Sequence, residues 1–145
     1  MILNLHQSHE PQDKVPDCGG CYTLVIILSK PRAIRVGKLG KTLFPAGTYL
    51  YTGSAMRSLR GRIVRHMRKK KKLHWHIDYL LNSPDALMKE IAIHVSSTHQ
   101  ECRYNKRIAG LPGAKVVLPG FGSSDCRAGC LSHLIQLRST CGPEV

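Results

Sequence analysis

Acidic residues and long apolar runs are the two features that this sequence has least of. Its 145 residues hold nine Asp and Glu against 22 Lys and Arg, a formal net charge of +13. The longest apolar run, 24–28, is far shorter than the roughly 20 residues of a membrane-spanning helix. Residues 1–17 lack the basic start and apolar stretch of a signal peptide. We therefore expect a cytoplasmic protein that does not enter a membrane.

The charge surplus indicates a polyanionic partner. Each phosphate that a basic side chain neutralises releases condensed counterions, so nucleic acid is favoured. An anionic membrane surface is a weaker alternative, because the basic residues do not join an exposed apolar helix face. A basic protein without any polyanionic partner is the remaining alternative. Aromatic residues make up 6% of the chain, too few outside a core to suggest a base-stacking platform.

The hydrophobic pattern predicts one α+β domain with a small central antiparallel β-sheet flanked by helices. We expect it to span 19–138, between a flexible N-terminal tail at 1–18 and a C-terminal tail at 139–145. Ser58 is a candidate N-cap, followed by an apolar stripe in which Leu59 and Ile63 are four residues apart. The expected strands are 21–28, 32–36 and 48–52, which form the sheet, then 87–95, 115–118 and 133–137; the expected helices are 59–67, 74–81 and 100–108.

The scarcity of acids limits where phosphate chemistry can occur. Cutting a phosphodiester needs an activated nucleophile, positive charge near the transition state and usually a divalent metal held by carboxylate. Beyond the N-terminal tail, the acids that precede Glu144 are Asp78, Asp85, Glu90, Glu101 and Asp125.

Two short tyrosine motifs stand about thirty residues apart. Gly20-Cys21-Tyr22 opens the first strand and Tyr51-Thr52-Gly53 closes the third, followed by Arg62 on the first helix. This order resembles the GIY-YIG nuclease superfamily. The blocks at 44–55, 74–81 and 120–126 are similar to its Uri branch of small stand-alone domains. The resemblance spans about 19–137 and implies an endonuclease that hydrolyses phosphodiester bonds, with DNA favoured over RNA.

The resemblance assigns a role to each matching residue. Tyr22 and Tyr51 match the two motif tyrosines, which position or deprotonate the attacking water beside the scissile phosphate. Arg62 matches the superfamily arginine, and its planar fork suits phosphate oxygens. Glu101 matches the metal-binding glutamate, where Mg²⁺ or Mn²⁺ is expected. His66, one turn after Arg62, is a candidate proton relay or phosphate ligand.

Other polar residues are secondary candidates. His74 and Asp78 share a helix face and form either a structural network, which we favour, or a rival metal site. Ser124 and Asp125 are placed to fill the position of an asparagine that the superfamily often has near its metal. A nucleic-acid-binding surface beside the site is expected to include Ser54, Arg65, Arg68, Lys69, Lys70, Lys71 and Lys72.

The six cysteines suggest reduced thiols, since no export signal accompanies them. Zinc prefers cysteine and histidine ligands, and the chain offers Cys126, Cys130 and His133, with Cys102 as a possible fourth. Their spacing is not a standard structural-zinc pattern, so zinc is not expected. Two alternative functions remain: a nucleic-acid-binding module that has lost catalysis, and a zinc-stabilised interaction domain.

Overall fold

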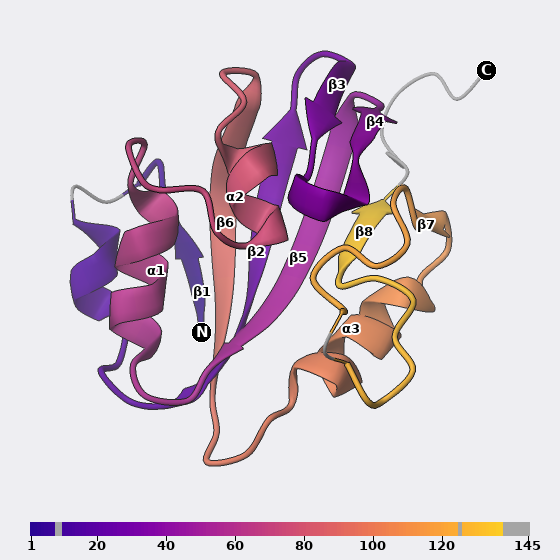
Figure 1. The fold of residues 1–145 in the computed structure, drawn as a ribbon. Helices are drawn as coiled ribbons and strands as arrows, with labels where there is room; N and C mark the ends of the chain where they lie inside the picture. The colour runs from indigo at the N-terminus through magenta and orange to yellow at the C-terminus, as the bar shows by residue number, and fades with distance from the viewer. Residues whose placement is uncertain (8–9, 125, 138–145) are drawn as a thin grey trace.

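The computed structural model describes residues 1–7, 10–124 and 126–137, and these form the predicted α+β fold (Figure 1). The predicted C-terminal tail at 139–145 lies outside the described residues. The elements follow in the order β1 (Ile2–Asn4), η1 (Pro11–Lys14), β2 (Gly20–Leu28), β3 (Arg32–Arg35), η2 (Gly37–Leu39), β4 (Lys41–Phe44), β5 (Gly47–Ala55), α1 (Leu59–Met67), α2 (His76–Leu81), β6 (Ala86–Val95), α3 (Glu101–Ala109), β7 (Ala114–Lys115) and β8 (Leu134–Leu137).

A six-stranded antiparallel sheet forms the centre of the fold, in the order β1-β6-β2-β5-β8-β7. Strand β2 is rich in β-branched residues and is buried along most of its length, as expected for a central strand. Tyr22 lies opposite Gly53 and Leu24 opposite Tyr51. Because opposite residues point to one face, these four share a side of the sheet.

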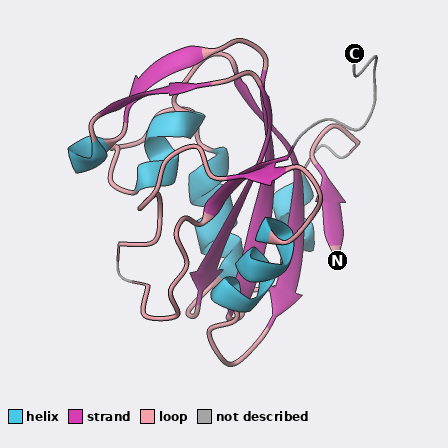
Figure 2. Ribbon diagram, turned by 90° about the vertical axis from the view of Figure 1, so that its right-hand side faces the viewer, coloured by secondary structure: helices cyan, strands magenta, loops and turns pink. Residues whose placement is uncertain are grey.

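The hairpin of β3 and β4 forms a separate two-stranded sheet. The sequence predicts that 32–36 joins 21–28 and 48–52 in one sheet, and this prediction is wrong. The reason is that β2 already has β6 on one edge and β5 on the other, which leaves no edge for β3. The hairpin instead stands off the sheet and contacts α2, as a view from the side shows (Figure 2).

The N-terminal segment was expected to be a flexible tail, but its described part belongs to the fold. Strand β1 pairs with β6, with Leu3 opposite Ile91. The side chains of Leu3 and Val15 are buried in the core. Short apolar stretches between polar residues hid this strand, because three residues show no usable alternation.

The three helices begin close to where the sequence predicts. Ser58 caps α1, and its hydroxyl accepts a hydrogen bond from the backbone N–H of Gly61 at 3.0 Å. Leu59 and Ile63 are fully buried beneath the helix, which confirms the predicted apolar stripe. Helix α2 begins two residues later than predicted, at His76, and α3 begins at Glu101. Within the described part of the chain, no helix is long and apolar enough to cross a membrane.

Candidate functional site

Two tyrosines and a histidine from three different elements meet beneath α1. Tyr22 on β2, Tyr51 on β5 and His66 on α1 are 1%, 9% and 2% exposed. The Tyr22 hydroxyl and the His66 Nε2 atom are 2.7 Å apart and share a hydrogen bond. The ring centroids of Tyr51 and His66 lie 6.5 Å apart. Three of the four residues predicted as a catalytic group therefore converge, but inside the core.

Burial keeps all three of these groups neutral. It raises the pKa of Tyr22 to about 12 and also raises the pKa of Tyr51. Burial, with a smaller contribution from Lys71, lowers the pKa of His66 to about 3. The buried Nδ1 atom of His66 has no hydrogen-bond partner among the described residues. A neutral, enclosed cluster suits the positioning of neighbouring groups better than direct contact with a substrate.

Arg62 extends from α1 toward the end of β5, where it is half-buried. One guanidinium nitrogen donates to the backbone oxygen of Ser54 at 3.0 Å. The guanidinium carbon lies 4.3 Å from the ring centroid of Trp75. A cation held against an indole face in this way is restricted in its motion while its remaining N–H groups stay free to bind an anion.

Arg65 was predicted to bind nucleic acid, but it is occupied inside the protein. Its two terminal nitrogens donate to the two carboxylate oxygens of Asp78, each at 2.8 Å. The Asp78 carboxylate also accepts from the backbone N–H groups of His74 and Trp75, both at 2.9 Å. Asp78 is fully buried, so the structural network that the sequence favoured is present in place of a rival metal site.

Glu101 lies on the other side of the sheet from the tyrosine cluster. Its carboxylate accepts a hydrogen bond from the hydroxyl of Ser54 on β5. Side chains alternate along a strand, so Ser54 points away from the face that carries Tyr51. His99, with its Nδ1 atom 3.6 Å from the carboxylate, is the neighbouring ionisable group. The cleft expected from the sequence is thus divided in two, and Arg62 reaches across the strand end between its halves.

A pocket of about 490 Å³ opens at this strand end. It brings two arginines, two hydroxyl groups and a histidine together beside the first turn of α1. Its walls are formed by Ser54, Ala55, Met56, Arg57, Ser58, Gly61, Arg62 and His99.

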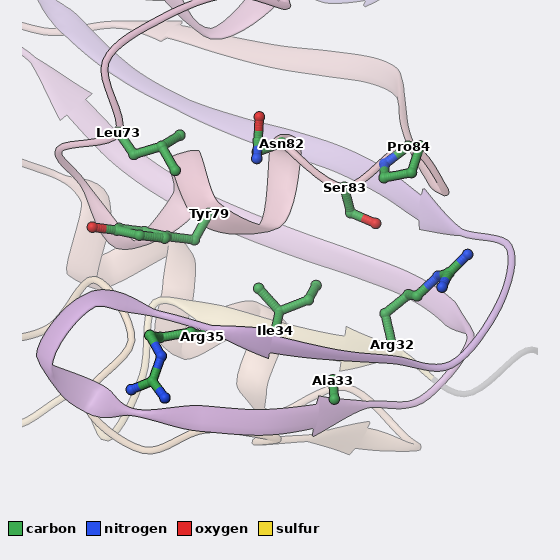
Figure 3. Close-up of a pocket in the computed structure, with 9 residues that line it drawn as sticks. All are labelled: Arg32, Ala33, Ile34, Arg35, Leu73, Tyr79, Asn82, Ser83 and Pro84. Atoms are coloured by element: carbon green, nitrogen blue, oxygen red, sulfur yellow. The ribbon is translucent and has the colours of Figure 1, made fainter.

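A second pocket, of about 470 Å³, lies between the β3–β4 hairpin and α2 (Figure 3). Tyr79 and Ile34 face each other across it, and Arg32 and Arg35 stand at its edges. It contains none of the predicted site residues. Sequence reasoning missed it because the hairpin was expected to lie within the sheet.

The basic run after α1 is divided between structure and solvent. Lys71 donates to the backbone oxygens of Arg65 and His66, at 3.2 and 2.9 Å, which satisfies the carboxyl end of the helix. Its neighbours Arg68, Lys69, Lys70 and Lys72 are exposed, and their contact with nucleic acid stays a prediction. Ser124 is exposed as well, whereas Asp125 lies outside the described residues.

The prediction of Mg²⁺ or Mn²⁺ without zinc is wrong. In the described part of the chain, the side chains that converge as a set of metal ligands are Cys102, Cys126, Cys130 and His133, whose ligand atoms all lie within 4.8 Å of one another. Thiolates and imidazole are ligands for zinc, whereas magnesium and manganese prefer oxygen. The sequence named these four residues but argued against zinc from their non-standard spacing, in which Cys102 on α3 stands 24 residues before Cys126.

Comparison with known proteins matches this chain to a protein family. No curated protein and no solved structure matches it. The family model covers residues 21–144, which is most of the chain. The resemblance to GIY-YIG nucleases therefore stays a prediction from motifs. The chain belongs to the family described as domain of unknown function DUF123.

Proposed function

We propose that the protein is a nuclease that hydrolyses phosphodiester bonds, with DNA favoured over RNA, as its resemblance to the GIY-YIG superfamily implies. The observation that carries this proposal is the pocket at the end of β5. Two arginines, Arg57 and Arg62, converge there with the hydroxyl groups of Ser54 and Ser58. The chain around it has a net charge of +13, which attracts a polyanion.

The pocket has the donors that a phosphate group requires. Arg62 uses one nitrogen on the Ser54 backbone oxygen, and its other N–H groups remain available to phosphate oxygens. Contact with Trp75 holds the guanidinium in place before substrate arrives. The first turn of α1 borders the same pocket, and the positive end of a helix dipole favours an anion. Charge that develops on phosphate in the transition state is thereby offset.

Asp17 accepts a hydrogen bond from the Ser58 hydroxyl of this pocket, and Glu101 accepts one from the Ser54 hydroxyl. Its link to Ser54 keeps one carboxylate oxygen beside a pocket wall, while His99 lines the pocket itself. A carboxylate in this place can orient a water molecule for attack on phosphorus. Tyr22 and His66 are positioning residues in this scheme, because both are buried and share a hydrogen bond. Burial raises the pKa of Tyr22, and the charge of Arg62 opposes that rise.

The second candidate function is a nucleic-acid-binding module without catalysis. The burial of Tyr22, Tyr51 and His66 favours it, because it leaves no exposed tyrosine or histidine of the motif to move protons on a substrate. In that case the arginine pocket would hold the backbone phosphate, and the exposed lysines would add sequence-independent affinity.

Cleavage of labelled single-stranded, double-stranded and branched DNA, with a matched RNA, tests the proposal. The variants are Arg62→Ala, Glu101→Gln and, as a control, Arg35→Ala, whose side chain lines the other pocket. We expect Arg62→Ala to lower the cleavage rate by about 10²–10³-fold, as loss of a group that stabilises transition-state charge does elsewhere. Each assay is run with several divalent cations and with a chelator.

The outcomes separate the candidates. Loss of product in Arg62→Ala and Glu101→Gln, with normal cleavage by Arg35→Ala, supports the nuclease. Salt-sensitive binding by the wild-type protein without any product under all cation conditions supports the binding module. Product that is equal in all four proteins would place the chemistry elsewhere and refute the assigned site.

A further inference from the structure

Three sulfur atoms and one imidazole nitrogen meet where α3, the loop at 116–133 and the start of β8 come together. Cys102 belongs to α3, Cys126 and Cys130 to the loop, and His133 precedes β8. The Cys102 and Cys126 sulfur atoms are 3.4 Å apart, and the Cys102 sulfur lies 3.6 Å from the Nε2 atom of His133. We propose that these four side chains form a structural zinc site.

The spacing of the ligand atoms matches that of tetrahedral zinc. With Zn–S bonds of about 2.3 Å and Zn–N bonds of about 2.05 Å, tetrahedral angles place two sulfurs about 3.8 Å apart and a sulfur and a nitrogen about 3.6 Å apart. The sulfur–nitrogen distance of 3.6 Å agrees with this, and the sulfur–sulfur distance of 3.4 Å is slightly shorter. All four atoms lie within 4.8 Å of one another, so an ion at their centre reaches each with small side-chain shifts.

The ligand chemistry selects zinc among the common divalent cations. Three thiolates and an imidazole are soft ligands in a closed set of four, the pattern of structural rather than catalytic zinc. Such a site carries a net charge of −1 when the thiols are ionised. Lys106 partly offsets that charge, since its ammonium group donates to the backbone oxygen of Ala128 beside the cluster. A hard cation would instead require oxygen ligands.

The fold supplies a reason for a metal at this place. Between β7 and β8 the chain runs through 116–133 without a helix or strand in its described residues. Loops of this length are held by internal bonds or by a cross-link. His76 accepts from the backbone of Gly122 at 2.8 Å, which fixes the first half. The second half holds Cys126 and Cys130, which the metal would tie to α3 at Cys102.

The zinc site also fixes one half of the proposed catalytic site, and this consequence rests on the proposed function. Cys102 follows Glu101 directly on α3, and the His133 backbone oxygen accepts from the Thr52 N–H of β5 at 3.1 Å. An ion that joins Cys102 to His133 therefore holds the first turn of α3 against β5. The Glu101 carboxylate then stays in contact with Ser54.

Metal content and cobalt spectra of the full chain test the site without any cleavage assay. The chain is purified in reductant, and its zinc content is measured by inductively coupled plasma mass spectrometry. We expect about one zinc per chain in the wild type. Cys126→Ser and Cys130→Ser should lose it, and Cys18→Ser, outside the cluster, should keep it. His133→Cys should also keep it, since four cysteines form an accepted zinc site.

A cluster variant could lose zinc simply because it does not fold, so thermal stability and cobalt binding are also measured in the wild-type protein. A chelator should lower the Tm of the wild-type protein and of Cys18→Ser, and added zinc should restore it. Cobalt substituted into the wild type should give the visible absorption of a tetrahedral thiolate site. Failure of the chain to retain zinc or cobalt under reducing conditions would overturn the proposal. A Cys102–Cys126 disulfide in protein purified without reductant, with no metal bound after reduction, would overturn it as well.

These results are independent of the nuclease assay. Zinc binding without cleavage would retain the metal site and refute the proposed function alone. Cleavage by a chain that binds no zinc would support the proposed function and refute the metal site. Loss of both zinc binding and cleavage in Cys126→Ser, with both retained in His133→Cys, would support the link through Glu101.

Discussion

Asp78 is the residue whose loss we expect to cost the protein most. Its buried carboxylate accepts two hydrogen bonds from Arg65 and one each from the backbones of His74 and Trp75, at 2.8–2.9 Å. Asp78→Ala removes the acceptor for all four. The guanidinium of Arg65 and two backbone N–H groups then lie in a partly buried place without a partner.

The expected cost follows from the burial of the two partners. Breaking a buried ion pair destabilises a protein by about 3–5 kcal/mol. The side chain of Arg65 is 24% exposed and can regain some water, so the lower end of about 3 kcal/mol applies. For a domain near this size, 1 kcal/mol corresponds to about 3 °C in Tm, so we expect a fall of about 10 °C.

The same pair predicts a pH window. Burial raises the pKa of Asp78, but the hydrogen bonds from Arg65, His74 and Trp75 outweigh it and hold the pKa at about 2. The folded-state pKa is thus below the ordinary aspartate pKa of 3.8. The stabilisation is therefore complete above about pH 4 and is lost as the pH falls toward 2. In Asp78→Ala this part of the acid dependence should be absent.

Urea denaturation of Asp78→Ala, Arg65→Ala and the double variant measures the coupling between the two side chains. The matched control is Asp85→Ala, which breaks a more exposed ion pair with Arg32 and should cost less than about 1 kcal/mol. A cost for Asp78→Ala no greater than that of the control, or a coupling energy near zero, would refute this account.

Two further predictions concern the buried cluster. Because burial lowers the pKa of His66 to about 3, the unfolded chain binds a proton between about pH 6.5 and 3 that the native chain does not. The free energy of unfolding should then decrease as the pH is lowered through this window, by up to about 1.4 kcal/mol per pH unit. In His66→Asn the urea midpoint should change less with pH. Gly53→Ala would place its new carbon 2.7 Å from the buried Tyr22 hydroxyl and should cost about 1–3 kcal/mol of unfolding free energy. Gly110→Ala is the control, since its nearest contacts are ordinary at 3.6 Å, and equal Tm shifts would contradict the packing argument.

Local signals were sufficient for the elements that depend on their own sequence. The apolar run of β2 and the hydroxyl cap of Ser58 act over a few residues, so pattern alone predicts both. Strand pairing depends on competition for sheet edges, which no local pattern records. For this reason β3 was expected in the sheet, and β1, whose Leu3 is buried against β6, was not expected at all.

The sequence indicated which residues would come together more successfully than it indicated how they would be arranged. The resemblance to GIY-YIG nucleases grouped Tyr22 and Tyr51 with His66, and these three side chains do meet. Their burial follows from how α1 lies on the sheet, which the sequence does not contain. Strand alternation alone could have shown that Ser54 faces away from Tyr51, and with it the separation of Glu101. The standard zinc spacings do not join Cys102 to a histidine 31 residues away, and for this reason zinc was not expected.

Strand β5 connects the two halves of the site, and each half has its own support. On one face, the Arg65–Asp78 pair fixes Trp75, and Trp75 lies against Arg62. On the other face, the proposed zinc holds α3 and therefore Glu101. The halves meet at Ser54, whose backbone oxygen accepts from Arg62 and whose hydroxyl donates to Glu101. Loss of Asp78 should therefore displace the arginine and leave zinc binding intact, whereas loss of zinc should displace the glutamate and leave the arginine in place.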